Sequence, residues 1–336
     1  MKVKALKQKR RIMILYTGGT IGMKATDRGL APVSGFKEVL FEHFDDRADQ
    51  LDTEFCFCEL EPVIDSSSMT PFYWQNIRDA IVQAVSKDQI DAVLVLQGTD
   101  TLAYSAAALA FQLIGLQSPV VFTGSMLPVG VEGSDAWENI DGALELLVDG
   151  VDLGVWLYFH GQIFLSVHCT KFRSAGRNPF VAPTKLDNCA SADSYFLNKI
   201  LKYTSRKTLA SVIVLPMYPG IGAEIIHVFL QLNVQGLILE CYGSGTGPSD
   251  DYEFINALRL ANKSGVVMVA ITQCFEGGIE LESYAAGSAL NDAGVISGAG
   301  MTREAAFGKL HMLLGLNLPI PEVKRLFQTD LCGELR

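Results

Sequence analysis

Short apolar runs alternate with longer amphipathic segments along the first half of the 336-residue chain. The apolar runs, rich in β-branched and aliphatic residues, predict strands at 11–16, 53–60, 91–96 and 120–123. The amphipathic segments between them predict helices at 71–85, 101–113 and 134–148. A hairpin is predicted at 154–160 and 162–168, around Gly161. This alternation is typical of an α/β domain whose mainly parallel sheet is flanked by helices on both faces.

The pattern weakens between Ser174 and Arg206, where Gly, Asn, Pro, Ser and Asp are frequent. It then resumes, with predicted strands at 210–215, 236–240 and 266–272 and predicted helices at 223–232, 250–262, 302–314 and from 321 onwards. We therefore expect two α/β domains, a larger N-terminal domain at 1–184 that carries the candidate site and a smaller C-terminal domain at 209–336, joined by a linker at 185–208. Division into two domains is usual for a chain of this length.

Composition narrows the class of protein. A hydrophobic fraction of 49% and a charged fraction of 19% argue against a disordered chain. The net charge of −10 argues against nucleic acid or an anionic membrane as a general partner, because phosphate binding relies on clustered Lys and Arg. The basic N-terminus resembles the start of a signal peptide, but the apolar run after it ends at Tyr16 and is too short. No apolar stretch is long enough to span a bilayer.

The seven cysteines favour a reduced, cytoplasmic protein, since their number is odd and their spacings are wide. Cys56 and Cys58 lie two residues apart in a predicted strand, so both thiols would face one side. No second cysteine pair and no histidine is close to them in the sequence. A metal site at these two cysteines is therefore not expected.

Two short motifs carry the candidate chemistry. Thr17–Gly22 (TGGTIG) and Gln97–Thr101 (QGTDT) each follow a predicted strand directly, which places Thr20 and Thr99 at the carboxyl ends of two strands. Ligands bind at this edge of open α/β sheets. A threonine hydroxyl is a poor nucleophile unless a base removes its proton and hydrogen-bond donors stabilise the oxyanion. A Gly-rich packing turn is the simpler alternative for the first motif, and the spacings of known phosphate loops are absent.

Charged and hydroxyl side chains that could serve these threonines follow other predicted strands. Asp100 is either the N-cap of the next helix or an acceptor for a substrate α-amino group. Asp65, Ser66 and Ser67 form either an ordinary capping turn or a grip for the zwitterionic end of an amino acid. Lys171 is either a solvated surface charge or, if it is buried beside the second threonine, a base.

In combination, these motifs resemble the bacterial-type L-asparaginase family. TGGTIG, a D-S-S-x-M turn, GTDT, a T-G-S segment and a downstream T-K occur in that order over nearly the whole chain. TGGTIGM and Thr272-Gln273-Cys274 make the chain most similar to the cytoplasmic type I branch. The resemblance implies hydrolysis of L-asparagine to L-aspartate and ammonia, in asparagine catabolism, through a threonine acyl-enzyme and without cofactor or metal. It also implies a homodimer or a homotetramer built as a dimer of dimers.

The resemblance also assigns the candidate site residue by residue. The implied catalytic residues are Thr20, as nucleophile, and the set Thr99, Asp100 and Lys171. The implied substrate-binding residues are Gly19, Asp65, Ser66, Ser67, Gly98, Thr99 and Asp100. Within this set, Ser66 would hold the substrate α-carboxylate and Asp100 the α-amino group. Backbone N–H groups of 19–20 and 98–99 would stabilise the oxyanion.

Three positions depart from the family pattern. Leu30 stands where members often carry a loop tyrosine that hydrogen-bonds the nucleophile, which leaves the group that activates Thr20 unassigned. Thr246 replaces an Asn, and this exchange bears on discrimination between asparagine and glutamine. Glu240 stands where some cytoplasmic members have an arginine that binds an effector asparagine, although Cys274 is retained. We therefore expect such an effector site to be weak or lost.

Two other functions use the same features. A related amidase, either a glutaminase or an asparaginase-like amidotransferase subunit, would carry the same motifs. The first strand begins near residue 11, which leaves no room for the N-terminal module expected of an amidotransferase subunit, and the acidic balance disfavours tRNA. A non-enzymatic amino-acid sensor would keep the fold, but the joint presence of Thr20, Thr99, Asp100 and Lys171 argues against it.

Overall fold

A six-stranded sheet forms the centre of the first of two compact units. The structure, a computed structural model, describes residues 9–26, 29–32, 35–44, 51–183, 201–204, 207–282 and 285–335. This N-terminal unit comprises Met1–Ala106, Leu116–Ser166 and Lys171–Phe180. Its strands, in spatial order, are β4 (Thr53–Ile64), β1 (Arg10–Gly18), β5 (Ala92–Leu96), β6 (Val120–Thr123), β7 (Val155–Phe159) and β8 (Gln162–Leu165). Neighbours are parallel except for β7 and β8. The predicted parallel sheet and its terminal hairpin are thus confirmed.

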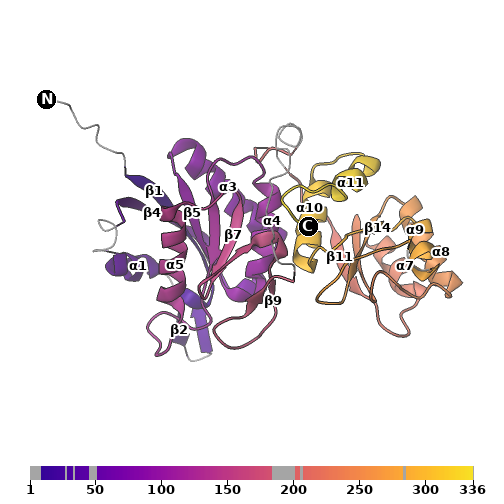
Figure 1. Ribbon diagram of the computed structural model, residues 1–336, viewed down its shortest axis with the longest axis horizontal. Helices are drawn as coiled ribbons and strands as arrows, with labels where there is room; N and C mark the ends of the chain where they lie inside the picture. The colour runs from indigo at the N-terminus through magenta and orange to yellow at the C-terminus, as the bar shows by residue number, and fades with distance from the viewer. Residues whose placement is uncertain are drawn as a thin grey trace. The chain divides into compact units, whose positions relative to one another are not determined.

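Helices cover both faces of this sheet (Figure 1). On one face, α1 (Phe36–Phe44) and α5 (Ala136–Asp149) pack against the even-numbered residues of β1 in one apolar cluster. The figure shows α3 (Pro71–Lys87) and α4 (Leu102–Gln112) on the other face. Proline occupies the first turn of α3, as the sequence predicts. The Trp74 indole of α3 donates to the Ser105 hydroxyl of α4, 2.9 Å away, which ties these two helices together.

The segment that leads to Lys171 differs from the prediction. Instead of one strand at 162–168, β8 ends at Leu165, and a 3₁₀ turn, η4 (Ser166–His168), follows. Lys171 then lies in a separate short strand, β9 (Thr170–Lys171), which pairs with β10 (Phe180–Val181). The sequence contains no Gly or Pro here to signal a break, so tertiary packing sets this turn.

The C-terminal unit comprises Ala107–Gly115, Val167–Thr170 and Val181–Arg336. Its four strands are parallel, in the order β11 (Val212–Pro216), β12 (Gly236–Cys241), β13 (Val267–Thr272) and β14 (Ile296–Ser297). Helices α7 (Ala223–Gln231), α8 (Tyr252–Lys263) and α9 (Ala285–Asp292) share one apolar cluster with the sheet. The remaining helices, α10 (Arg303–Gly315) and α11 (Ile320–Phe327), lie on the other side (Figure 1).

Sequence patterns predicted the longer elements of this unit and missed α9 and β14, which are short and weakly periodic. Of the predicted linker at 185–208, residues 185–200, which include Cys189, and residues 205–206 lie outside the described residues. The boundaries of the two predicted domains therefore stay a prediction.

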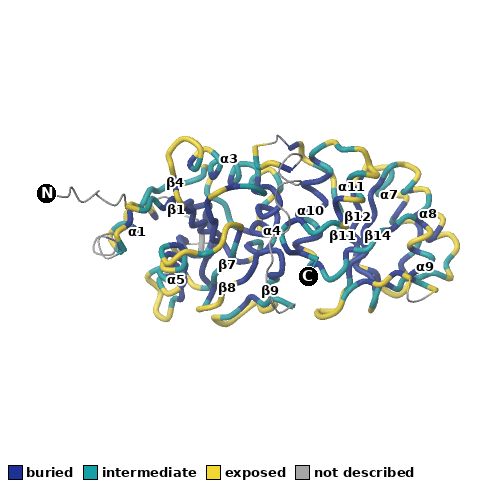
Figure 2. The backbone as a smooth tube through the Cα atoms, turned by 45° about the horizontal axis from the view of Figure 1, so that its top comes forward, coloured by how far each residue is buried: buried dark blue, intermediate teal, exposed yellow. Residues whose placement is uncertain are grey.

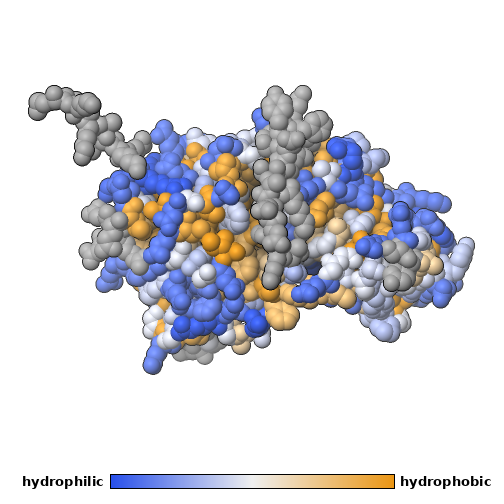
Figure 3. Space-filling view, viewed as in Figure 1, coloured by the Kyte–Doolittle hydropathy of each residue, from blue (hydrophilic) through white to orange (hydrophobic). Residues whose placement is uncertain are grey.

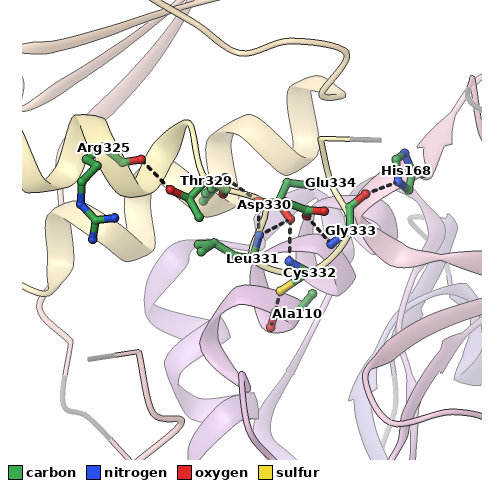
Figure 4. A network of polar contacts seen from close by, with 10 residues as sticks. Ala110, His168, Arg325, Thr329, Asp330, Leu331, Cys332, Gly333 and Glu334 are labelled. Atoms are coloured by element: carbon green, nitrogen blue, oxygen red, sulfur yellow. Dashed lines mark hydrogen bonds and ion pairs between the residues drawn. The ribbon is translucent and has the colours of Figure 1, made fainter. Parts of the chain in front are cut away.

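The last described residues of the C-terminal unit are held by buried polar contacts (Figure 4). Lys309 of α10 pairs with Glu334, and both side chains are fully buried. The Glu334 carboxylate also accepts from the backbone N–H groups of Leu331 and Cys332, at 3.0 and 2.7 Å. Burial lowers the pKa of Lys309, and Glu334 opposes that change. We call 330–334 and its contact with Lys309 the C-terminal clamp.

Buried residues follow the strands of both units, and exposed residues follow loops and outer helix faces (Figure 2). The face in view carries many hydrophilic residues, with hydrophobic residues between them (Figure 3). Among the described residues, no helix has the length and apolar character needed to cross a membrane.

Candidate active site

The two threonine motifs meet through their backbones. Strands β1 and β5 are parallel neighbours, with Tyr16 opposite Leu96, so both motifs leave the sheet at the same edge. Gly19 has a φ of +89°, and a Cβ built on it would lie 2.1 Å from the Gly98 nitrogen. A side chain at this position is excluded by both the backbone conformation and the contact. The predicted convergence of the two motifs is confirmed.

A third turn joins them. A Cβ on Gly98 would lie 2.5 Å from the Ser66 hydroxyl, so the Ser66 turn contacts the second motif directly. The Thr101 hydroxyl donates to the Ser66 carbonyl oxygen at 2.8 Å. Ser66 is buried, while Ser67 is exposed. The Asp65 carboxylate accepts from the Ser67 N–H at 2.8 Å, so Asp65 does cap the 3₁₀ turn η2 (Ser66–Ser68).

Thr20 begins a 3₁₀ turn, η1 (Thr20–Gly22), and is half-buried. Tyr16 packs beneath this turn, because a Cβ on Gly22 would lie 2.1 Å from the Tyr16 hydroxyl oxygen. The ring of Tyr16 also contacts Phe36, with the centroids 4.8 Å apart. Burial raises the pKa of Tyr16 well above its ordinary value, which keeps this phenol neutral. Tyr16 therefore supports the turn from the core side.

The second motif carries a Thr–Lys–Asp set. Lys171 Nζ donates to the Thr99 hydroxyl at 2.9 Å and to the Asp100 carboxylate at 2.6 Å. The side chain of Lys171 is 17% exposed and that of Asp100 is 63% exposed. The contact with Thr99 brings the amine within the hydrogen-bond distance that proton transfer requires. Asp100 is not a helix N-cap, because Gly98 caps η3 (Thr99–Thr101) and the Asp100 side chain pairs with the lysine instead.

The loop 124–129, after β6, contacts both threonine turns. The sequence analysis did not identify the residues that bind this loop. A Cβ on Gly124 would lie 2.2 Å from the Gln97 oxygen, and Val129 N–H donates to the Ile21 oxygen at 3.1 Å. Buried Asp135 and Asn139 bind this loop. The sequence signal was slight, because Asp135 was assigned to the start of a predicted helix.

The positions that depart from the family pattern fall elsewhere. Glu240 is the penultimate residue of β12, is buried in the C-terminal unit and pairs with Arg303 of α10. Thr246 donates to the Tyr242 oxygen at 3.3 Å within a tight turn. The structure describes the backbone of Leu30 in β3 (Gly29–Pro32), but its side chain is not among those described. The exchange of the loop tyrosine for Leu30 therefore stays a prediction. The loss of an effector site stays a prediction.

Paired threonine turns at the carboxyl edge of a parallel sheet, with a lysine on the second hydroxyl, define a threonine-dependent hydrolase of the α/β class. Two family matches agree: Asparaginase, N-terminal, over residues 11–197, and Glutaminase/Asparaginase C-terminal domain, over residues 211–327. The chain therefore belongs to the asparaginase family of amidohydrolases.

Individual relatives support this assignment over the full length. The chain is 36% identical to L-asparaginase 1 of Escherichia coli, over 98% of each chain. It is 35% identical to the L-asparaginase I of Vibrio cholerae seen in a crystal structure, with a TM-score of 0.84 over 98% of this chain and 99% of that one. It is also 33% identical to the 60 kDa lysophospholipase of Mus musculus, matching 99% of this chain but 64% of that protein.

Proposed function

We propose that the chain hydrolyses L-asparagine to L-aspartate and ammonia, with Thr20 as the nucleophile. The observation that carries this proposal is the contact of Lys171 Nζ with the Thr99 hydroxyl, beside the backbone contact of Gly19 with Gly98. A two-step acyl transfer requires a nucleophile and a group that accepts protons, and the Thr99–Lys171 pair offers such a group.

In the first step, the Thr20 oxygen attacks the side-chain amide carbonyl, and the developing oxyanion is stabilised by backbone N–H groups of 19–20 and 98–99. Collapse of the tetrahedral intermediate breaks the C–N bond, and the nitrogen leaves as ammonia with the proton that the Thr20 hydroxyl gives up on attack. In the second step, water attacks the acyl-enzyme. The pair of Thr99 and Lys171 is placed to accept the water proton, and the Thr20 hydroxyl is restored as aspartate leaves.

The polar groups at the same edge suit the α-substituents of an amino acid. Ser66, with its turn against Gly98, is proposed to hold the α-carboxylate, with Asp65 and Ser67 beside it. The exposed Asp100 carboxylate is proposed to accept from the α-amino group. A free amino acid would thus be bound at both ends before its side-chain amide meets Thr20.

The remaining features of this proposal follow the type I resemblance. We propose that the enzyme works in the cytoplasm, in asparagine catabolism, as a homodimer or a homotetramer. We also propose domains at 1–184 and 209–336, with the linker at 185–208. The matched ranges 11–197 and 211–327 support a division of this kind.

The test is ammonia release by the purified chain from L-asparagine and from L-glutamine, with fatty-acid release from a lysophospholipid measured in parallel. We expect the highest kcat/KM for asparagine. Thr20→Ala should abolish turnover, and Thr20→Ser, which keeps a hydroxyl, should retain part of it. Thr53→Ala removes a buried hydroxyl at the amino end of β4, where Thr53 donates to the Leu51 oxygen, and is the matched control.

Full turnover by Thr20→Ala would reject the nucleophile. Faster hydrolysis of glutamine would instead favour the related-amidase alternative. Asparagine binding without turnover by the unaltered chain would favour the sensor.

A further inference from the structure

We propose that Asp135 and Asn139 are positioning residues that set the placement of both threonine turns through the loop 124–129. This inference rests on the proposed function, because the two turns matter as parts of one hydrolytic site. Neither Asp135 nor Asn139 belongs to the implied catalytic or substrate-binding set. Both lie at the start of α5, and both are buried, with exposures of 1% and 0%.

The Asp135 carboxylate accepts three N–H groups. Two come from the loop backbone, with Met126 N at 3.0 Å from both oxygens and Leu127 N at 3.1 Å from one of them. The third comes from the Asn139 amide, at 3.0 Å. An ionised carboxylate offers acceptors only, which matches this set of donors. The side chain therefore fixes two consecutive backbone groups of the loop.

The Asn139 amide fixes the beginning of the same loop. Its nitrogen donates to the Gly124 carbonyl oxygen at 3.0 Å, and its oxygen accepts from the His160 N–H at 2.8 Å. Asn139 thereby anchors the loop to the turn between β7 and β8. Ser134 adds a contact at the other side, where its hydroxyl donates to the Leu127 oxygen at 3.1 Å.

The loop held in this way touches each threonine turn once. At its start, Gly124 is so close to the Gln97 carbonyl that a Cβ would lie 2.2 Å from that oxygen and 3.8 Å from the Thr99 methyl carbon. At its end, Val129 N–H donates to the Ile21 oxygen, one residue after Thr20. A shift of the loop is therefore passed to both hydroxyl-bearing turns. Since a misplacement of about 1 Å between reacting groups costs about 100-fold in rate, the anchors of the loop affect kcat.

Asp135→Asn keeps the side-chain shape and replaces one acceptor oxygen with an amide nitrogen that faces N–H donors. We expect kcat for asparagine to fall about 10- to 100-fold, with a smaller change in KM. The matched control is Ser118→Ala, which removes a buried hydroxyl that donates to the Ile90 oxygen before β6, at the opposite edge of the sheet. It should keep kcat at the level of the unaltered chain.

Hydrogen–deuterium exchange supplies a readout that needs no turnover. Backbone amides of 20–22 should exchange faster in Asp135→Asn than in the unaltered chain, and Ser118→Ala should leave them unchanged. If the unaltered chain does not hydrolyse asparagine, the proposed function fails, while the exchange rates still decide this inference.

A folded Asp135→Asn with unchanged kcat and unchanged exchange at 20–22 would overturn the proposal. If Asp135→Asn does not fold, Ser134→Ala decides, because this half-buried hydroxyl makes one contact with the loop and one with the Ala136 N–H, and neither involves a buried charge. For Ser134→Ala, a fall in kcat at constant KM, smaller than the fall expected for Asp135→Asn, would support the proposal. An unchanged kcat and unchanged exchange would reject it.

Discussion

We predict that acidification destabilises the C-terminal unit through His311. This histidine lies in α10 and is 3% exposed. Its Nε2 accepts a hydrogen bond from the Ala210 N–H at 3.2 Å, which only an unprotonated nitrogen can do. Burial lowers the pKa of His311 from 6.5 to about 4. Protonation would place a charge in the core and remove the acceptor for Ala210.

The direction and size of the effect follow from these two pKa values. The folded pKa lies below the unfolded one, so between them the unfolded chain binds more protons. The contribution of neutral His311 is fully present above the unfolded value of 6.5, and it is lost as the pH falls from 6.5 through about 4. At about 1.4 kcal/mol for each pH step, the loss amounts to about 3 kcal/mol of the free energy of unfolding.

Urea unfolding, followed by circular dichroism between about pH 7.5 and about pH 4.5, measures this loss. His311→Gln keeps an acceptor for Ala210 but does not titrate, so its free energy of unfolding should change less over this range than that of the unaltered chain. His227→Gln, at an exposed position on α7, is the matched control. Identical pH dependence in His311→Gln and the unaltered chain would refute the reasoning.

Three further outcomes are expected. Lys171→Met should lower kcat about 10²- to 10⁴-fold while the protein stays folded, since it removes the amine from the second hydroxyl; a fall below tenfold in steady-state rates would contradict its role as a base. Gly19→Ala should abolish activity and soluble yield, whereas Gly130→Ala, at a similar φ of +84° with no atom within 4 Å of its Cβ, should keep both. Glu334→Gln should lower the free energy of unfolding by about 3–5 kcal/mol in urea titrations, because it leaves Lys309 buried without its ion pair; paired substitution by Lys309→Met and Glu334→Leu should recover most of this loss.

The sequence was informative where local pattern and topology agree. Buried strands followed directly by Gly-Thr motifs predicted that Thr20 and Thr99 lie at one sheet edge, and the parallel pairing of β1 with β5 confirms it. The period of apolar residues also gave the long helices to within a few residues, as for α3 and α10. These features depend on neighbours in the chain, which a single sequence displays.

Features that depend on distant partners could not be predicted in the same way. Asp100 could equally have been a helix cap, because its partner Lys171 lies 71 residues further along. The turn before Lys171 has no breaker residue, and the role of Asp135 depends on backbone groups of a folded loop. Among these contacts, only that of Gly19 with Gly98 was indicated in the local sequence, by the glycines themselves. A glycine does not indicate which distant residue it contacts.

That contact between main chains also bears on protein engineering. The Thr20 turn and the Thr99 turn approach each other through backbone atoms, which every amino acid shares, provided that Gly19 and Gly98 remain glycine. A combinatorial library that keeps Gly19 and Gly98 fixed can therefore vary neighbouring side chains of the N-terminal unit without moving the two turns apart. Substrate preference can then be searched separately from the placement of the two threonine turns, which the backbone contact supplies in every member of the library.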